Sequence, residues 1–398
     1  MIVRKLWNKN FILVCVTYFF IACTFNLLMP TIPIYLSEKL AVPHSKIGIV
    51  LSSYAIALLI IRPFCGFWVD KYNRKMLLLL GTLLFVAAFV GYYFAVSVLF
   101  LVVLRFFHGM FWALSTVAAN TVAIDIIPSK RRAEGIGYFG ATASIAMAIS
   151  PYIAVSLYKT NGFNYLVSCA IFMGVIGILL TIFIRVPFRV RNSASTPISF
   201  DRFILVKGIP ILLNQVLLSF GWGTLVAYAI LYGKETGVAN PGVFFLFLAL
   251  GIVLSRVVSG RLVDRGYLHN TIAIALITIA FGFICFAYLH GTFYYCLSAF
   301  FIGLGYGTLF PALQTLYINM APAYKRGTAN STYLTGFDLG IGIGILIGSV
   351  IAGYTGYSTM YMLTAASCFL ALIIYWLNSR KVYERNKLIK ENSGKLKL

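Results

Sequence analysis

The sequence contains little charge, and acidic residues are its scarcest component. Charged residues make up 11% of the 398 positions, and Asp and Glu together number 10. An ordinary soluble domain carries about a quarter charged residues. The chain contains no P-loop, no His/Glu metal motif and no nucleophile elbow. These absences disfavour a soluble enzyme, and we expect no catalytic residues, no metal and no cofactor.

Cysteine offers no alternative chemistry. The chain has seven cysteines, an odd number, and all of them lie within apolar runs. Their spacing matches neither a disulfide framework nor a metal site. We expect them to be small buried side chains.

Apolar residues, in contrast, make up 61% of the chain. A helix that crosses a bilayer needs about 20 consecutive apolar residues. Runs of this size predict an all-α membrane protein with about twelve spans, the first of them uncleaved. They lie at 11–36, 46–69, 75–96, 98–127, 133–158, 163–186, 209–232, 241–263, 271–290, 292–320, 327–353 and 357–377.

The net charge of +22 is explained by topology and not by nucleic-acid binding. Lys and Arg concentrate in alternate short segments between the spans, including Lys71, Arg74, Arg132 and Arg326. Cytoplasmic loops of membrane proteins carry this excess of basic residues. We therefore expect a multi-pass protein of the cell (inner) membrane with both termini in the cytoplasm.

The chain divides into two halves that repeat each other. The pattern Arg62-x3-Gly66-x3-Asp70 recurs as Arg256-x3-Gly260-x3-Asp264, and 256 − 62 = 194 residues separate the copies. The same offset relates further pairs, namely Gly109 to Gly303, Asn120 to Gln314 and Arg132 to Arg326. Parallel repeats build two bundles with a site between them. We predict six-helix bundles at 1–190 and 207–380, a cytoplasmic linker at 191–206 and a basic tail at 381–398.

The loop after the second span carries a family signature. It reads Gly66-Phe-Trp-Val-Asp70-Lys71-Tyr-Asn73-Arg74, which resembles the signature of the major facilitator superfamily, with Asn73 where that family often has Gly. The resemblance implies a cytoplasmic gate formed by this loop, its second copy and a fourth-span acid. The expected gate residues are Gly66, Asp70, Lys71, Arg74, Asp125, Gly260, Asp264 and Arg265.

Three further segments resemble the drug:proton antiporter branch of that superfamily. The first span ends in Pro30-x-x-Pro33, and Arg105-Phe-Phe-His108-Gly109 is similar to the Arg-x-x-Gln-Gly element of the fourth helix. The fifth-helix pattern Gly-Pro-x-x-Gly-Gly survives only as its proline, Pro151. This departure weakens the implied exporter assignment.

Ionisable residues at bilayer depth are costly unless paired or hydrated, so each one is a candidate for function. Asp338 lies about 11 residues into its span, or roughly 16 Å deep at 1.5 Å per residue. It could carry a proton, or it could be a buried structural acid. Arg105 could control a nearby carboxylate, bind an anionic group or pair structurally, and His108 could carry a proton or only pack. Arg62 and Arg256 are expected to extend toward the cytoplasm or to brace the gate.

Other polar and aromatic residues within the spans could line a central cavity. These candidates are Asn26, Trp112, Asn120, Gln215, Trp222, Tyr228, Tyr306, Gln314 and Tyr333. Many aromatic residues of so apolar a chain instead face lipid or pack between helices.

The sequence thus favours a monomeric secondary transporter of a small organic molecule, with proton-coupled, multidrug-type efflux by alternating access as the leading hypothesis. A proton symporter that imports a sugar, peptide or organic anion is the alternative. A membrane enzyme or scaffold is the alternative from a different class.

Overall fold

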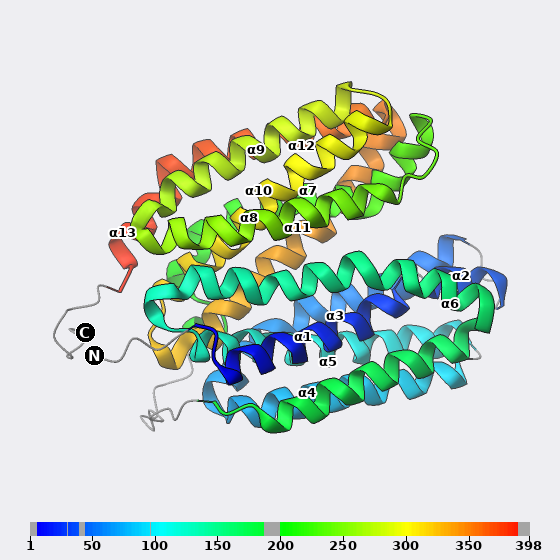
Figure 1. Ribbon diagram of the computed structural model, residues 1–398, viewed down its shortest axis with the longest axis horizontal. Helices are drawn as coiled ribbons and strands as arrows, with labels where there is room; N and C mark the ends of the chain where they lie inside the picture. The colour runs from blue at the N-terminus through cyan, green and yellow to red at the C-terminus, as the bar shows by residue number, and fades with distance from the viewer. Residues whose placement is uncertain (1–5, 30, 40–43, 96, 187–199, 389–398) are drawn as a thin grey trace.

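The computed structural model describes residues 6–29, 31–39, 44–95, 97–186 and 200–388, and helices account for most of them. The N-terminal bundle consists of α1 (Lys9–Leu28), α2 (Ile32–Glu38), α3 (His44–Lys71), α4 (Arg74–Val90), α5 (Val98–Ile126) and α6 (Arg132–Phe183). The C-terminal bundle consists of α7 (Ile209–Glu235), α8 (Val243–Leu262), α9 (Leu268–Tyr288), α10 (Thr292–Asn319), α11 (Arg326–Thr355) and α12 (Tyr357–Ile374), and the short α13 (Arg380–Asn386) follows. Figure 1 shows the two bundles side by side.

Ten segments of the described chain are long and apolar enough to cross a membrane. One of them, Val243–Tyr288, contains both α8 and α9. In addition, α6 reverses direction at Gly162, whose φ of 81° is readily adopted only by glycine. Separating α8 from α9 and counting the limb of α6 before Gly162 gives the twelve predicted spans.

The predicted first span, 11–36, is wrong as a single helix. Helix α1 ends at Leu28, and the separate helix α2 begins at Ile32 with a proline in its first turn. Proline lacks the backbone N–H that continues a helix, and it disfavours helical geometry in the residue before it. The Pro30-x-x-Pro33 sequence explains the break.

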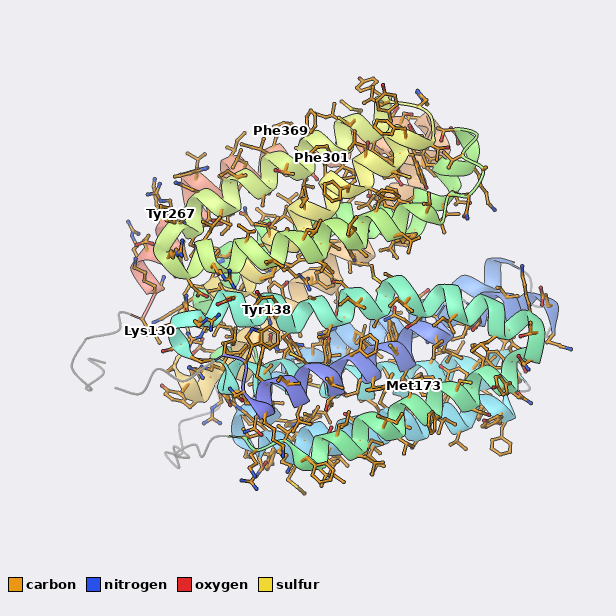
Figure 2. All side chains as sticks on the ribbon, in the orientation of Figure 1. Lys130, Tyr138, Met173, Tyr267, Phe301 and Phe369 are labelled. Atoms are coloured by element: carbon orange, nitrogen blue, oxygen red, sulfur yellow. The ribbon has the colours of Figure 1, made fainter. Side chains whose placement is uncertain are left out.

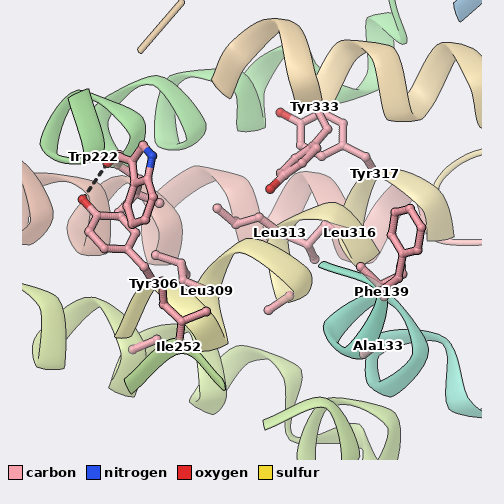
Figure 3. Packing of buried hydrophobic residues seen from close by; sticks show 14 of the residues in the cluster. Ala133, Phe139, Trp222, Ile252, Tyr306, Leu309, Leu313, Leu316, Tyr317 and Tyr333 are labelled. Atoms are coloured by element: carbon pink, nitrogen blue, oxygen red, sulfur yellow. Dashed lines mark hydrogen bonds between the residues drawn. The ribbon is translucent and has the colours of Figure 1, made fainter. Parts of the chain in front are cut away.

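Large apolar side chains cover the outer faces of both bundles, as expected for a protein surrounded by lipid. Phe369, which is 42% exposed, lies on the outer surface of the C-terminal bundle (Figure 2). The interior between the helices is filled by a continuous apolar cluster, part of which is shown in Figure 3.

The start of α1 and helix α13 lie at the same end of the molecule (Figure 1). Figure 2 shows Lys130 and Tyr267 at this end as well. We call it the basic end, because its loops carry the clustered Lys and Arg residues. The predicted linker 191–206 and tail 381–398 fall largely outside the described residues.

Helix pairs α3–α11 and α6–α8 join the bundles. The offset of 194 residues relates these two pairs to each other, since it carries α3 onto α8 and the start of α6 onto α11. The interface therefore has approximate twofold symmetry.

Candidate functional site

An ion pair joins the two bundles in the interior of the protein. Arg62 of α3 contacts the carboxylate of Asp338 of α11 through Nε, and their side chains are 5% and 14% exposed. Arg62 lies eight residues before Asp70, or about 12 Å along the helix from the basic end. Of the two roles predicted for Arg62, extension toward the basic end is therefore wrong, because its guanidinium pairs with Asp338. Bracing of the gate stays a prediction.

Small residues on α11 determine which way Asp338 points. A Cβ atom at Gly340 would lie 2.5 Å from the carbonyl oxygen of Val216, and one at Gly344 would lie 2.2 Å from that of Phe220. The glycine face of α11 thus packs against α7. Residues two positions apart lie on opposite faces of a helix, so Asp338 faces the N-terminal bundle.

Polar side chains from both bundles surround this ion pair. Gln314 donates hydrogen bonds to Asn120 over 3.1 Å and to Asn330 over 2.7 Å. Ser331 donates a hydrogen bond to the backbone carbonyl of Arg62. Tyr18 of α1 lies within electrostatic range of both Arg62 and Asp338. The interior between the bundles is therefore polar, although the surrounding helices are apolar.

Asp70 binds the first turn of α11 at the basic end. Its carboxylate accepts hydrogen bonds from the backbone N–H groups of Gly327 at 2.8 Å and Thr328 at 2.7 Å. The N-terminus of a helix carries unpaired N–H groups and a partial positive charge that favour an anion. Arg74 also donates to Asp70 over 2.7 Å. This contact links the N-terminal bundle to the C-terminal bundle.

The second copy of the motif forms the same contact in the opposite direction. Asp264 accepts hydrogen bonds from the backbone N–H groups of Ala133 at 3.0 Å and Glu134 at 2.9 Å, at the start of α6. Subtracting 194 from Gly327 and Thr328 gives these same two positions. Both acids were predicted as gate residues, and each one caps the repeat-related helix of the other bundle.

Two glycines allow these helices to approach. A Cβ atom at Gly66 would lie 2.6 Å from Cβ of Ser331, and one at Gly260 would lie 2.5 Å from Cα of Glu134. Both distances are shorter than nonbonded contacts between carbon atoms permit. Glycine is therefore required at both positions if the bundles are to touch at the basic end.

Charged side chains extend the contact between the bundles. Asp125 pairs with Arg74 of its own bundle and with Arg326 of α11, the latter at 3.0 Å. In the repeat, Arg132 donates to Asn319 over 2.8 Å, so an amide takes the place of the acid. We call Asp70, Arg74, Asp125, Arg326, Asp264, Arg132 and Asn319 the closure network.

Glu134 adds a further link beside the closure network. It accepts hydrogen bonds from Arg131 at 2.5 Å and from Arg261 of α8 at 3.1 Å. The hydrogen bonds to Glu134 raise the pKa of Arg131, which lies in the loop before α6, above its usual value. Arg131 is therefore charged at every physiological pH.

Two of the charged residues predicted for the gate take no part in the closure network. Lys71 is exposed and lies over the rings of Phe67 and Tyr72, at 5.5 and 5.4 Å from their centroids. Arg265 is exposed next to Asp264. Both residues contribute positive charge at the basic end without joining the bundles.

Arg105 and His108 lie in the N-terminal bundle and do not meet Asp338. The guanidinium of Arg105 stacks over the ring of Tyr54 at 4.4 Å, and one of its nitrogens lies 3.2 Å from the sulfur of Met29. His108 shares a hydrogen bond of 2.9 Å with Tyr92 and packs against Phe85. No acid pairs with Arg105 among the described residues, and the aromatic surroundings of His108 favour a packing role.

The predicted cavity residues separate into two groups. Asn120, Gln314 and Tyr333 lie near the ion pair, between the bundles. Others pack within one bundle, as Figure 3 shows for Trp222 and Tyr306, whose ring centroids are 5.2 Å apart. Trp112 stacks on Phe25. Hydrogen bonds within one bundle are donated by Tyr306 to Leu218, by Gln215 to Ser219, by Tyr228 to Ile345 and by Asn26 to Ala22.

Sequence reasoning missed Tyr18, Glu134 and the pairing of Arg62. An arginine at bilayer depth is costly unless it is paired, and this cost could have suggested Asp338, an acid expected at bilayer depth, as the partner of Arg62. Within the described part of the chain, no group of three or more His, Cys, Asp or Glu residues is arranged to hold a metal ion.

Comparison with known proteins gives consistent matches along the whole chain. The family model described as Major Facilitator Superfamily matches residues 14–292 and 211–397. The multi-drug resistance efflux pump PmrA homolog of Lactococcus lactis is 24% identical, and the match covers 97% of this chain and 98% of that protein. The quinolone resistance protein NorA of Staphylococcus aureus is 26% identical over 87% of this chain and 89% of that protein. A crystal structure of the Escherichia coli fucose:proton symporter FucP superposes with a TM-score of 0.77 at 16% identity, covering 94% and 99% of the two chains.

Proposed function

This chain belongs to the Major Facilitator Superfamily and is a secondary transporter of small molecules across a membrane, and on that premise we propose that it is a proton-coupled exporter of an organic compound. The relatives named as multidrug and quinolone resistance proteins support the outward direction. The basic end is the cytoplasmic side, in keeping with the excess of Lys and Arg there. The transporter acts as a monomer in the cell membrane.

The observation that carries the proton coupling is the ion pair between Arg62 and Asp338. Its two partners belong to different bundles, so the pair stabilises the conformation in which the bundles touch at the basic end. Protonation of Asp338 removes its charge and leaves Arg62 without a counter-ion. The interaction between the bundles is then weaker, and the conformation open to the cytoplasm becomes more populated.

The transport cycle follows from this population shift. A proton that reaches Asp338 from outside favours opening of the basic end. When substrate then binds from the cytoplasm, Asp338 releases this proton to the cytoplasm. Deprotonated Asp338 pairs with Arg62 again, the closure network reforms, and the substrate faces outward. Proton and substrate are coupled because they favour opposite states, which requires no direct contact between them.

Reconstitution in liposomes tests this proposal. The vesicles contain a pH-sensitive dye and receive a panel of amphiphilic cations, organic anions, sugars and peptides. We expect one class of compound to move protons in the opposite direction to itself, and Asp338→Asn to abolish that movement while Asp201→Asn, a change at an acid in the loop before α7, retains it. Proton movement in the same direction as the compound would instead indicate a symporter.

A further inference from the structure

Arg256 is a buried cation for which the described residues supply no counter-ion. It lies on α8 and is 6% exposed, and neither its Nε nor its Nη1 has a hydrogen-bond partner in the described part of the chain. No ion pair to Arg256 is found among those residues either. A buried charge without a partner is strongly unfavourable, so this arrangement requires an explanation.

The repeat shows what is missing beside Arg256. Arg256 corresponds to Arg62, and the position that corresponds to Asp338 is 338 − 194 = 144, which is a serine. The hydroxyl of Ser144 is directed to the carbonyl of Gly140 in its own helix, at 3.3 Å. One copy of the repeat thus contains the acid and the arginine, whereas the other contains the arginine alone.

The guanidinium of Arg256 lies at the contact between the bundles. A Cβ atom at Gly140 of α6 would lie 3.0 Å from its Nη1 and 3.3 Å from its Cζ, so the group rests directly against the N-terminal bundle. Tyr18 of α1 and Tyr333 of α11 lie within electrostatic range. Since Tyr18 is also within range of Asp338, Arg256 belongs to the same polar interior as the ion pair.

We propose that Arg256 binds an acidic group of the transported molecule, so that the substrate is an organic anion or a zwitterion with a carboxylate. The guanidinium is planar and always charged, and it binds carboxylates through two parallel hydrogen bonds. A bound carboxylate supplies the negative charge that Asp338 supplies to Arg62. This inference rests on the proposed transport function and assigns separate tasks to the two arginines: Arg62 responds to the proton on Asp338, and Arg256 recognises the substrate.

Ligand binding to the purified protein tests the inference without requiring transport. The probes are three matched pairs of an acid and its neutral amide: dansylglycine and dansylglycinamide, 2-naphthoate and 2-naphthamide, and N-acetyltryptophan and its amide. Thermal unfolding is followed by circular dichroism over a range of probe concentrations. We expect at least one acid to stabilise the protein and its amide to bind about tenfold or more weakly.

Three variants identify the site. Arg256→Gln and Ser144→Asp should each weaken binding of the acid by about tenfold or more. In Ser144→Asp the reason is that the new carboxylate pairs with the guanidinium of Arg256. Arg256→Lys should bind with intermediate affinity, and the control Lys381→Gln, at an exposed position of α13, should bind as the original protein does. Without ligand, Arg256→Gln should not lower the melting temperature, whereas loss of a merely structural arginine would lower it.

The contrary outcomes are equally specific. Equal binding of acids and amides, unchanged acid binding by Arg256→Gln, or no stabilisation by any acid would each overturn the assignment. Each of these results would still be compatible with the proposed proton-coupled transport, with a neutral or cationic compound as the substrate. Conversely, acid binding without proton movement in liposomes would refute the proposed coupling and retain the assignment of Arg256.

Discussion

Gln314 donates a hydrogen bond of 3.1 Å to Asn120, and these two residues occupy the same position in the two repeats. Such a contact between equivalent residues occurs where the approximate symmetry axis passes. The Arg62–Asp338 pair and the isolated Arg256 lie on either side of that axis. The two sides have the same backbone arrangement but different charge.

Neutralising Asp338 should open the basic end and make the separation of the bundles there independent of pH. Spin labels at Tyr72 and Tyr267, which are 48% and 57% exposed at the basic ends of the two bundles, report the separation. We expect the distance in the original protein, measured in a cysteine-free background, to increase at acidic pH. In Asp338→Asn the longer distance should prevail at every pH, and proton-driven flux should be abolished, a loss of well over about tenfold. A pH response that survives in the variant would contradict the role of Asp338.

A methyl group at either motif glycine should force the bundles apart. The Cβ atom of Gly260→Ala would meet only backbone atoms of α6 at these distances, whereas that of Gly66→Ala would lie closest to the side chain of Ser331, at 2.6 Å, and 3.0 Å from the carbonyl oxygen of Gly327. Overpacking of this kind costs about 1–3 kcal/mol, and we expect the larger effect at Gly260. The same pair of spin labels measures the shift toward the open state. The control is Gly353→Ala, since a Cβ atom there meets nothing within 4 Å; a shift of the same size in that variant would refute the steric argument.

Asp125 and Asn319 should respond in opposite ways to a change of charge. Asp125→Asn removes one of the negative charges that balance the buried guanidinium of Arg74, which is 5% exposed. Removal of one partner from a buried ion pair lowers stability by roughly 3–5 kcal/mol. Asn319→Asp places a carboxylate opposite Arg132 and should stabilise the closed state by about 1 kcal/mol. Thermal unfolding and the spin-label distance measure both effects. If Asn319→Asp opens the basic end instead, the repeat does not predict the energetics of the closure network.

The ring of Tyr54, and not its hydroxyl, should stabilise Arg105. The guanidinium lies 4.4 Å from the ring centroid, and the hydroxyl has no hydrogen-bond partner among the described residues. We expect Tyr54→Phe to unfold at nearly the same temperature as the original protein. Tyr54→Leu should be destabilised by about 2 kcal/mol, because it loses a desolvated cation–π contact. Equal destabilisation by the two variants would show that the hydroxyl matters.

Periodicity and charge distribution predicted much of the architecture. Apolar runs gave the number and approximate bounds of the spans, because a bilayer requires helices of a fixed length. The break between α1 and α2 was missed although two prolines lie there, since apolar composition continues through it. The gate acids Asp70 and Asp264 were identified from the repeated motif, but their partners were not, because those partners are backbone N–H groups that no side-chain pattern reveals.

The candidate cavity was predicted less well. Trp222 and Tyr306 are as polar and aromatic as Tyr333, yet they pack within the C-terminal bundle. Which face of a helix a residue occupies depends on how that helix is rotated against its neighbours. In α11 that rotation is determined by glycines which contact the backbone of α7. The sequence shows these glycines at four-residue spacing, but it does not show which helix they contact.

The amino-acid sequence was sufficient to identify a two-bundle membrane transporter, because the bilayer restricts span length and the repeat restricts the arrangement of the halves. It also predicted that Asp338 lies at bilayer depth. The pairing of Asp338 with Arg62, and the lack of an acid beside Arg256 among the described residues, became visible only in the folded structure. Pairing depends on distances across the contact between the bundles. The replacement of the acid by Ser144 in the other repeat affects the charge of the interior only because folding places both arginines, Arg62 and Arg256, at that contact.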